Sequence, residues 1–227
     1  MMTIPGNPLP ISPALWTDLN TGRPTDQFYN YVFKLDNIIG NLVQGGTAPF
    51  SLLNTLVAAN SASLDDTTSI SSTYNLYMIA LDNLAPIVNT DDLILQYRVS
   101  GAFAAANYSS ILAGAFATGA GGVGMAADAF RNDGIMIGPH ANTQFSGIIN
   151  TGSGLSGMLW LHLPNGAGNH KHLTGSVAWE SVGAQLINSA VVGGTYIGST
   201  AIVTGIRVKF VGGNINFGNI RVYGLKT

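Results

Sequence analysis

The chain has 227 residues, which is enough for one large β domain and a small additional segment. Hydrophobic residues make up 46% of the chain, but charged residues only 9%, against about 25% in an ordinary soluble domain. The net charge is −2 and no basic stripe is present, so we expect no nucleic-acid binding. Cysteine is absent, which excludes a disulfide scaffold. Without an apolar run of about 18 residues, no membrane insertion is expected either.

The N-terminal region predicts an arm followed by one helix. Residues 1–24 hold five prolines, which favours an extended arm. Residues 25–43 carry apolar side chains at alternating spacings of four and three residues, which predicts a helix. The helical seam consists of Phe28, Val32, Leu35, Ile39 and Leu42. Two roles remain open for this seam: packing against the β body of the same chain, or a short dimeric or trimeric bundle. We expect residues 1–46 to anchor and oligomerise the chain, and residues 47–227 to form the main domain.

From about residue 50 the apolar residues recur at every second position, which predicts β-strands. The strands that we expect lie at 55–59, 74–81, 93–100, 145–150, 155–163, 171–181, 183–188, 199–210 and 215–223. Their spacing is typical of an antiparallel sandwich, and no helical pattern lies between them. The last two strands should form a terminal hairpin through Gly212-Gly213-Asn214, because Gly and Asn tolerate a positive φ. The Ala- and Gly-rich stretch 101–133 fits either two short strands or a long exposed loop.

Three local patterns together resemble a known family. Residues 72–103 combine Tyr-x-x-Tyr, a Leu-Asp-Asn-Leu-x-Pro corner and Asp-Asp-Leu-x-Leu-x-Tyr-x-x-Ser. Residues 202–224 give the terminal two-strand pattern, and residues 21–37 place Gly-x-Pro-Thr before an aromatic helix. This set resembles tailed-bacteriophage virion proteins of the tail-fibre and minor structural class. The resemblance implies an all-β, antiparallel jelly-roll-like sandwich preceded by an N-terminal arm and one α-helix.

The resemblance also implies partners and a location. It implies a homo-oligomer, with a trimer favoured, that joins other virion proteins through residues 1–46 and contacts a host surface glycan. The chain would then be located in the virion as a small fibre or spike. A capsid decoration protein that staples neighbouring capsomers is the first alternative, and a glycan-degrading tail enzyme is the second.

Few residues suggest chemistry. His170 and His172 would lie on one side of a strand, close enough to share a metal ion, although the segment around them also reads as a polar loop. Tyr97 and Tyr108 are the rings that we expect to be exposed and able to contact a glycan, whereas Trp160 and Trp179 follow the apolar alternation and should pack in the core.

The remaining motifs favour structural roles. The sequence "GAGGVG" at 119–124 matches a dinucleotide-binding fingerprint, but no βαβ unit surrounds it, so a loop or a close subunit approach is expected. The Asp doublets at 65–66 and 91–92 suit turns, and neighbouring strand residues point to opposite faces, so neither doublet forms an acid/base pair. We therefore expect no catalytic residues and no cofactor.

Overall fold

The computed structural model describes residues 50–225 except residues 90, 119–120, 130, 140–144, 163 and 183–184. The chain divides into two units, Met1–Ala48 and Pro49–Thr227, and everything described belongs to the second. The expected arm, the helix with its seam, and the boundary at residue 46 lie outside the described residues. In the part of the chain that is described, no helix has the length and hydropathy needed to cross a membrane.

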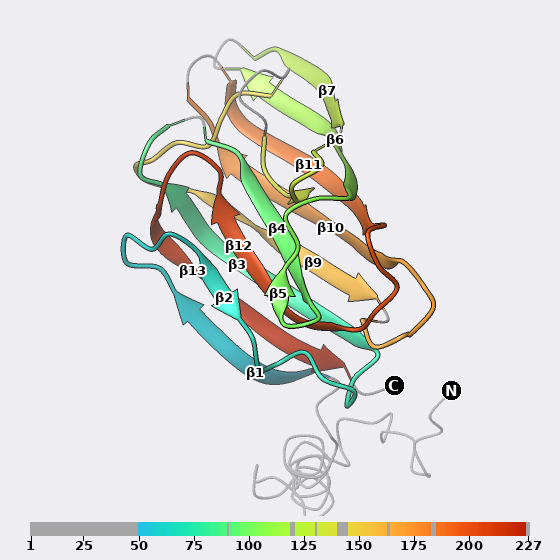
Figure 1. Cartoon of the computed structure of the whole chain (residues 1–227). Helices are drawn as coiled ribbons and strands as arrows, with labels where there is room; N and C mark the ends of the chain where they lie inside the picture. Colours follow the sequence, from blue (N-terminus) through green and yellow to red (C-terminus); the bar gives the residue numbers. More distant parts are fainter. Residues whose placement is uncertain are drawn as a thin grey trace, which may run out of the picture. The chain divides into compact units, whose positions relative to one another are not determined.

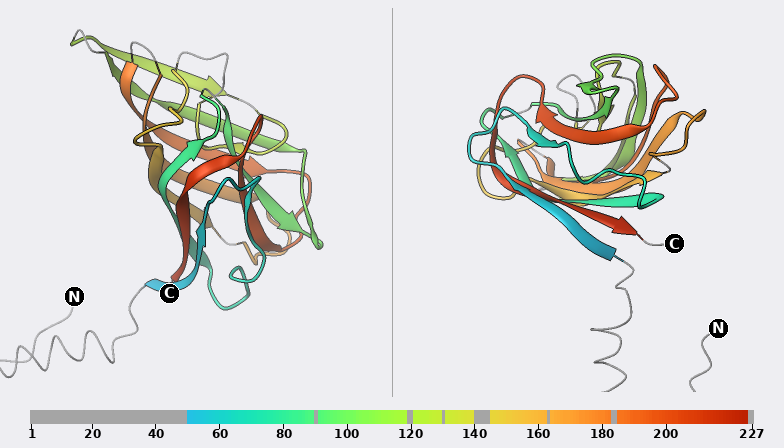
Figure 2. Two further views of the ribbon diagram at one scale, coloured as in Figure 1. Left: turned by 90° about the vertical axis from the view of Figure 1, so that its left-hand side faces the viewer. Right: turned by 60° about the horizontal axis from the view of Figure 1, so that its bottom comes forward.

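The second unit consists of two antiparallel sheets, which confirms the all-β prediction (Figure 1). The large sheet has the strand order β1-β13-β3-β9-β10-β11-β6-β7. Its strands are β1 (Phe50–Val57), β13 (Ile215–Leu225), β3 (Leu76–Pro86), β9 (Leu155–His162), β10 (Lys171–Glu180), β11 (Gln185–Tyr196), β6 (Tyr108–Thr118) and β7 (Val123–Ala129). The large sheet is strongly curled, and the small sheet lies inside its curve (Figure 2).

The small sheet has the strand order β2-β12-β4-β5, and one further short strand, β8, pairs with β4. Its strands are β2 (Leu64–Asp66), β12 (Val203–Phe210), β4 (Leu93–Val99), β5 (Ala102–Phe103) and β8 (Ile135–Met136). Because every pairing in both sheets is antiparallel, the strands can connect through short loops without crossover helices.

Strand β10 shows how alternation builds the core between the sheets. Leu173, Val177 and Trp179 are buried, whereas Thr174, Ser176 and Ala178 face the other side of the sheet. The Trp179 ring meets the Phe145 ring edge-on at 5.3 Å, and its Nε1 donates a hydrogen bond to the Ser146 carbonyl at 3.0 Å. The indole therefore buries its apolar surface without leaving its N–H unpaired, and the prediction that Trp179 packs in the core is confirmed.

Strand β4 differs because it is buried on both faces. One face packs into the core, Asp133 and Gly134 lie against Gln96 and Ile94 on the other, and β8 pairs along the edge of β4. The Gln96 amide donates to the Asp133 carbonyl at 2.7 Å, and Ile137 N donates to Leu93 O at 3.0 Å. β4 begins with the buried apolar run Leu93-Ile94-Leu95, as a doubly covered strand requires, and the buried Gln96 that follows has its amide hydrogen-bonded.

The predicted terminal hairpin is wrong. β12 pairs with β2 and β4 in the small sheet, whereas β13 pairs with β1 and β3 in the large sheet. The Gly212-Gly213-Asn214 connection carries the chain from one sheet to the other. Hydrogen bonds to the residues just before β4 hold this connection in place: Gly212 N donates to Asp91 Oδ1 at 2.8 Å, and Val211 N donates to Asp92 O at 3.0 Å.

Two other regions differ from the expectation or complete it. Residues 145–150 form only an isolated bridge between Ile148 and Ser181 instead of a strand. The ambiguous stretch 101–133 contains the β6–β7 hairpin, and the described part of "GAGGVG", residues 121–124, leads from its turn into β7. Gly121 has a φ of +79°, which explains a glycine at this turn.

Candidate functional site

The candidate site lies on the face of the large sheet that points away from the small sheet, here called the outer face. Strand register places side chains from neighbouring strands in rows across this face. The first row consists of Phe50, Leu225, Leu76, His162, His172, Thr195 and Ser109. The second consists of Leu52, Tyr223, Met78, Trp160, Thr174, Gly193 and Ile111. The two rows bring together residues that lie far apart in the sequence.

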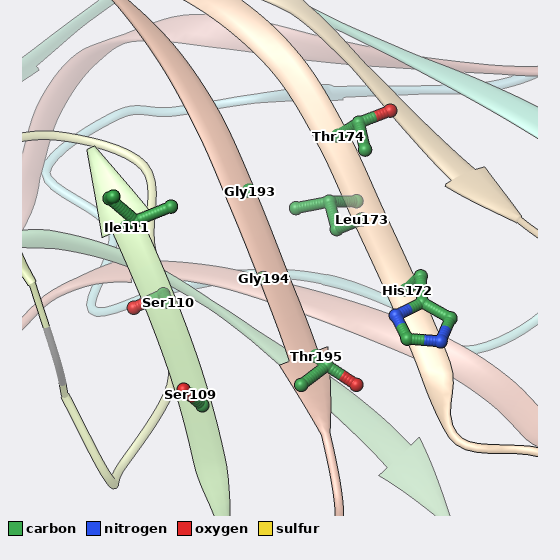
Figure 3. A pocket seen from close by; sticks show the side chains of 9 residues that line it. All are labelled: Ser109, Ser110, Ile111, His172, Leu173, Thr174, Gly193, Gly194 and Thr195. Carbon is green, nitrogen blue, oxygen red and sulfur yellow. The ribbon is translucent and has the colours of Figure 1, made fainter. Parts of the chain in front are cut away.

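A shallow hollow opens over β11, where Gly193 provides no side chain between Thr174 on β10 and Ile111 on β6 (Figure 3). Hydroxyl groups border the hollow on both sides. The residues that line it are Ser109, Ser110, Ile111, His172, Leu173, Thr174, Gly193, Gly194 and Thr195. No charged side chain is among them, so a ligand would meet neutral hydrogen-bonding groups.

A second hollow adjoins the first and shares His172 with it. It is lined by His162, Gly168, Asn169, His170 and His172. His162 and His172 are directly opposite each other on β9 and β10, and both are exposed. His162 Nε2 lies 2.9 Å from Thr174 Oγ1. We call the two adjoining hollows together the histidine hollow.

Hydrogen bonds from Lys171 and Asn165 hold the loop that carries His170 in place. Lys171, the first residue of β10, is fully buried and its Nζ donates to the Gly166 carbonyl. Burial lowers the pKa of Lys171 from its ordinary 10.5. On the same loop, Asn165 Nδ2 donates to the Tyr74 carbonyl at 2.9 Å. These contacts fix the position of the loop against the end of the large sheet.

An aromatic pair lies beside the histidine hollow. The Trp160 and Phe50 rings are tilted to each other with centroids 6.0 Å apart. Trp160 is half-buried on the outer face, so the prediction that it packs in the core is wrong. Trp160 and Trp179 both alternate with apolar neighbours, but they lie on opposite faces of the same sheet, and alternation alone does not say which face is inside.

Tyr97 and Tyr108 were expected to be exposed rings that contact a glycan, and this expectation is wrong. Both are buried in the core, with exposed fractions of 0% and 1%. Tyr108 OH accepts a hydrogen bond from Tyr97 N at 2.8 Å and donates one to Ala104 O at 3.2 Å. Burial raises the pKa of both phenols. Together with Tyr196, whose ring centroid is 4.9 Å from that of Tyr108, they close one end of the core.

Within the described ranges, no group of three or more His, Cys, Asp or Glu side chains could hold a metal ion. His170 and His172 line one hollow, as the sequence suggested, but their sharing of a metal stays a prediction. The partner that sequence reasoning missed is His162, because its position opposite His172 depends on the register of β9 against β10.

The described aspartates that form ion pairs hold the fold together. Arg207 pairs with Asp65 at 2.6 Å and Arg221 pairs with Asp82 at 2.8 Å. Burial raises the pKa of Asp65, but hydrogen bonds from Arg207 and Ser63 and the charge of Arg207 outweigh this and leave the pKa lowered. Thus Asp65 is held as a carboxylate by a neighbouring arginine, which does not suit a proton donor.

Asp66 lies next to Asp65 but points the other way, as expected for neighbouring strand residues. It is fully buried, and its Oδ1 accepts hydrogen bonds from Thr68 N and Ser69 N, both at 3.1 Å. This carboxylate therefore shapes the turn after β2.

No protein-family model, curated protein or solved structure matches this chain. Its function is therefore inferred from the surface chemistry of the sandwich.

Proposed function

We propose that this chain is a structural protein of a bacteriophage particle, a small trimeric fibre or spike whose sandwich meets the host surface. The patterns at 21–37, 72–103 and 202–224 motivate this class of protein. The observation that carries the proposal is the outer face of the large sheet, a broad and nearly uncharged surface with a neutral hollow beside an aromatic ring. A jelly-roll-like arrangement of the sandwich is part of the proposal.

Formal charge is sparse on this face. Along the described strands, its charged side chains are Arg221, Asp82 and Glu180, and the first two pair with each other. Glu180 accepts a hydrogen bond from Ser153 N at 3.3 Å. A surface of this kind favours neutral partners that bind through hydrogen bonds and van der Waals contact.

The partner we favour is a host surface glycan. The face of an indole ring can stack on the C–H surface of a pyranose, and Trp160 supplies such a ring next to Thr174. The hydroxyls of Thr174, Thr195 and Ser109 and the imidazole of His172 supply hydrogen-bonding groups. We propose Trp160 as the glycan contact, because Tyr97 and Tyr108 are buried.

The N-terminal region would join the chain to the particle. We assign oligomerisation to the seam of the helix at 25–43 and attachment to other virion proteins to residues 1–46. A short bundle is marginal in water, so a trimer would also need contacts from the sandwich.

Capsid decoration is the second candidate, and one observation favours it. Val123 and Met125 on β7 are 78% and 82% exposed. With Ile111, Ile187 and Val191, which are also exposed, they form an apolar patch on the outer face at the β7 end of the large sheet. A neighbouring capsid subunit could cover such a patch. A glycan-degrading activity ranks last, because the described ion-paired aspartates have structural partners.

The test is binding of the purified full-length chain to a panel of bacterial surface polysaccharides. A fibre predicts saturable binding to at least one of them, and Trp160→Ala should reduce that binding at least about fivefold, because stacking on a ring is worth about 1 kcal/mol or more. Val57→Ala is the matched control, because Val57 is an exposed residue on the same face, on the edge strand β1. A chain that binds no polysaccharide or host cell, but raises the heat resistance of capsids, would be a decoration protein.

A further inference from the structure

We propose that His162 and His172 chelate one divalent transition-metal ion on the outer face of the large sheet. This site shares His172 and Thr174 with the proposed glycan contact, but it depends neither on glycan binding nor on the phage assignment. It rests on the pairing of two strands and on the chemistry of the side chains around the pair.

Strand register provides the geometry. His162 on β9 and His172 on β10 are direct cross-strand partners, and both side chains are exposed on the same face. Directly opposite residues have Cβ atoms about 4.5–5.5 Å apart. Two imidazole nitrogens that bind one zinc ion at about 2.0–2.1 Å must lie about 3.3 Å from each other in tetrahedral geometry. Rotation about the side-chain torsions of His162 and His172 can bring one nitrogen of each ring to this separation of about 3.3 Å.

A hydrogen bond already orients one of the two rings. His162 Nε2 lies 2.9 Å from Thr174 Oγ1, and Thr174 is two residues beyond His172 on the same face of β10. The ring of His162 is therefore drawn toward the strand of its partner, and its Nδ1 is left to bind the metal. Partners of this kind commonly fix the ring orientation of a metal-binding histidine.

The surroundings select the class of metal. The residues that line the hollow beside the pair are Gly168, Asn169 and His170, none of which is a carboxylate. Calcium and magnesium prefer oxygen ligands with carboxylates among them, whereas imidazole suits zinc, nickel and copper. The pair should therefore bind Cu²⁺ most tightly, then Ni²⁺ and Zn²⁺, and should not bind Mg²⁺.

Two protein ligands leave coordination positions open. Because no group of three suitable side chains converges within the described residues, we assign the remaining positions to water. His170 lines the same hollow and lies in the loop held by Lys171 and Asn165, so it is near the ion without being one of the two primary ligands.

The experiment is isothermal titration calorimetry of the full chain, purified without a polyhistidine tag, with CuCl₂, NiCl₂, ZnCl₂ and MgCl₂. We expect one ion per chain for the first three and no heat of binding for Mg²⁺. Saturable binding should disappear in His162→Ala and in His172→Ala, and Thr174→Val should weaken it about tenfold. His140→Ala, which removes a histidine outside the pair, is the matched control and should bind like the parent chain.

Electron paramagnetic resonance of the Cu²⁺ complex gives a second readout, because two coordinated imidazoles produce a nitrogen hyperfine pattern that one cannot. Thermal unfolding shows whether each variant is folded. Unchanged binding in a folded His162→Ala or His172→Ala variant would overturn the proposal, as would loss of binding in His170→Ala alone. The same holds if the parent chain binds none of the three ions. The titration contains no polysaccharide, and glycan binding is tested separately through Trp160, so a failure of metal binding can be told apart from a failure of glycan binding.

Discussion

Strands β4 and β10 come from the two sheets and follow opposite rules. β4 is buried on both faces, and Arg98 is its only partly exposed residue. β10 is buried on one face only, and the other presents His172, Thr174 and Ser176 to solvent. Function by contact therefore requires a strand of the second kind, because there the sequence can vary on one face while the core remains intact. The predictions below test whether the two faces of the large sheet are as independent as this comparison implies.

The largest expected effect comes from the pair of tryptophans. Trp179→Ala should lower the free energy of unfolding by about 3–5 kcal/mol, because it empties a packed site and removes the contact with Phe145. Trp160→Ala should cost only about 1–2 kcal/mol, since the ring is half-buried and its contact with Phe50 is at the surface. Urea unfolding of the two variants measures both. Equal losses would contradict the division into an inner and an outer face.

The next effect compares two ion pairs. Asp92 and Arg131 have side chains only 7% and 15% exposed, whereas Asp82 and Arg221 on the outer face are 48% and 41% exposed. Asp92→Asn should cost about 1.5–3 kcal/mol, because it removes a charged hydrogen-bond partner from a mostly buried pair, although Arg131 keeps its pair with Asp133. Asp82→Asn should cost less than about 1 kcal/mol. The midpoints of denaturant unfolding test the difference, and a larger loss in Asp82→Asn would reverse the comparison.

A smaller effect is expected with pH. Hydrogen bonds from Arg131 lower the pKa of Asp133, and its charge adds to this effect. For Asp65, burial raises the pKa, but Arg207 and a hydrogen bond from Ser63 together outweigh burial, and the pKa is lowered. A carboxyl with a lowered pKa stabilises the fold above its ordinary value of 3.8, and this contribution is lost as the pH falls through the folded-state pKa.

These two groups should therefore leave stability nearly constant between pH 5 and 7 and reduce it below about pH 4. Asp133→Asn should make the acid-induced loss shallower, which unfolding curves over a pH series would reveal. If the variant lost stability in acid as steeply as the parent chain, Asp133 would not contribute to it.

The smallest effect on stability is expected at the apolar end of the outer face. Val123→Thr should change the free energy of unfolding by less than about 0.5 kcal/mol, because the side chain is 78% exposed. It should nevertheless reduce self-association, because it makes the exposed patch more polar. Sedimentation velocity of the parent and the variant measures this. An unchanged profile together with a large loss of stability would mean that Val123 packs in the fold.

Alternation was enough to predict most strands of the large sheet, because a strand with one buried face alternates clearly, as β9 and β10 do. It could not predict which face is inside, and for this reason Trp160 was assigned to the core. Tyr97 and Tyr108 were misplaced because tyrosine suits both a surface and a core in which its hydroxyl is hydrogen-bonded.

Long-range pairing was the other information that the sequence lacked. Gly212-Gly213-Asn214 suits a hairpin, but it also suits a connection between two sheets, and the partners of β12 and β13 lie far away in the chain. For the same reason the His162–His172 pair could not be predicted, since the spacing of residues within β9 and β10 does not determine the register between the two strands. The β6–β7 hairpin was ambiguous because its sequence is rich in alanine and glycine, which have low strand propensity and therefore do not distinguish a strand from a loop.

The central claim is that the outer face of the large sheet is the surface through which this protein acts. Titrating ¹⁵N-labelled chain with surface-polysaccharide fragments, while recording the indole N–H signals of Trp160 and Trp179, tests it most directly. The account predicts that the Trp160 signal shifts in a saturable way while that of Trp179, whose N–H is bonded to Ser146, stays in place. Saturable binding that leaves the Trp160 signal unmoved would contradict it.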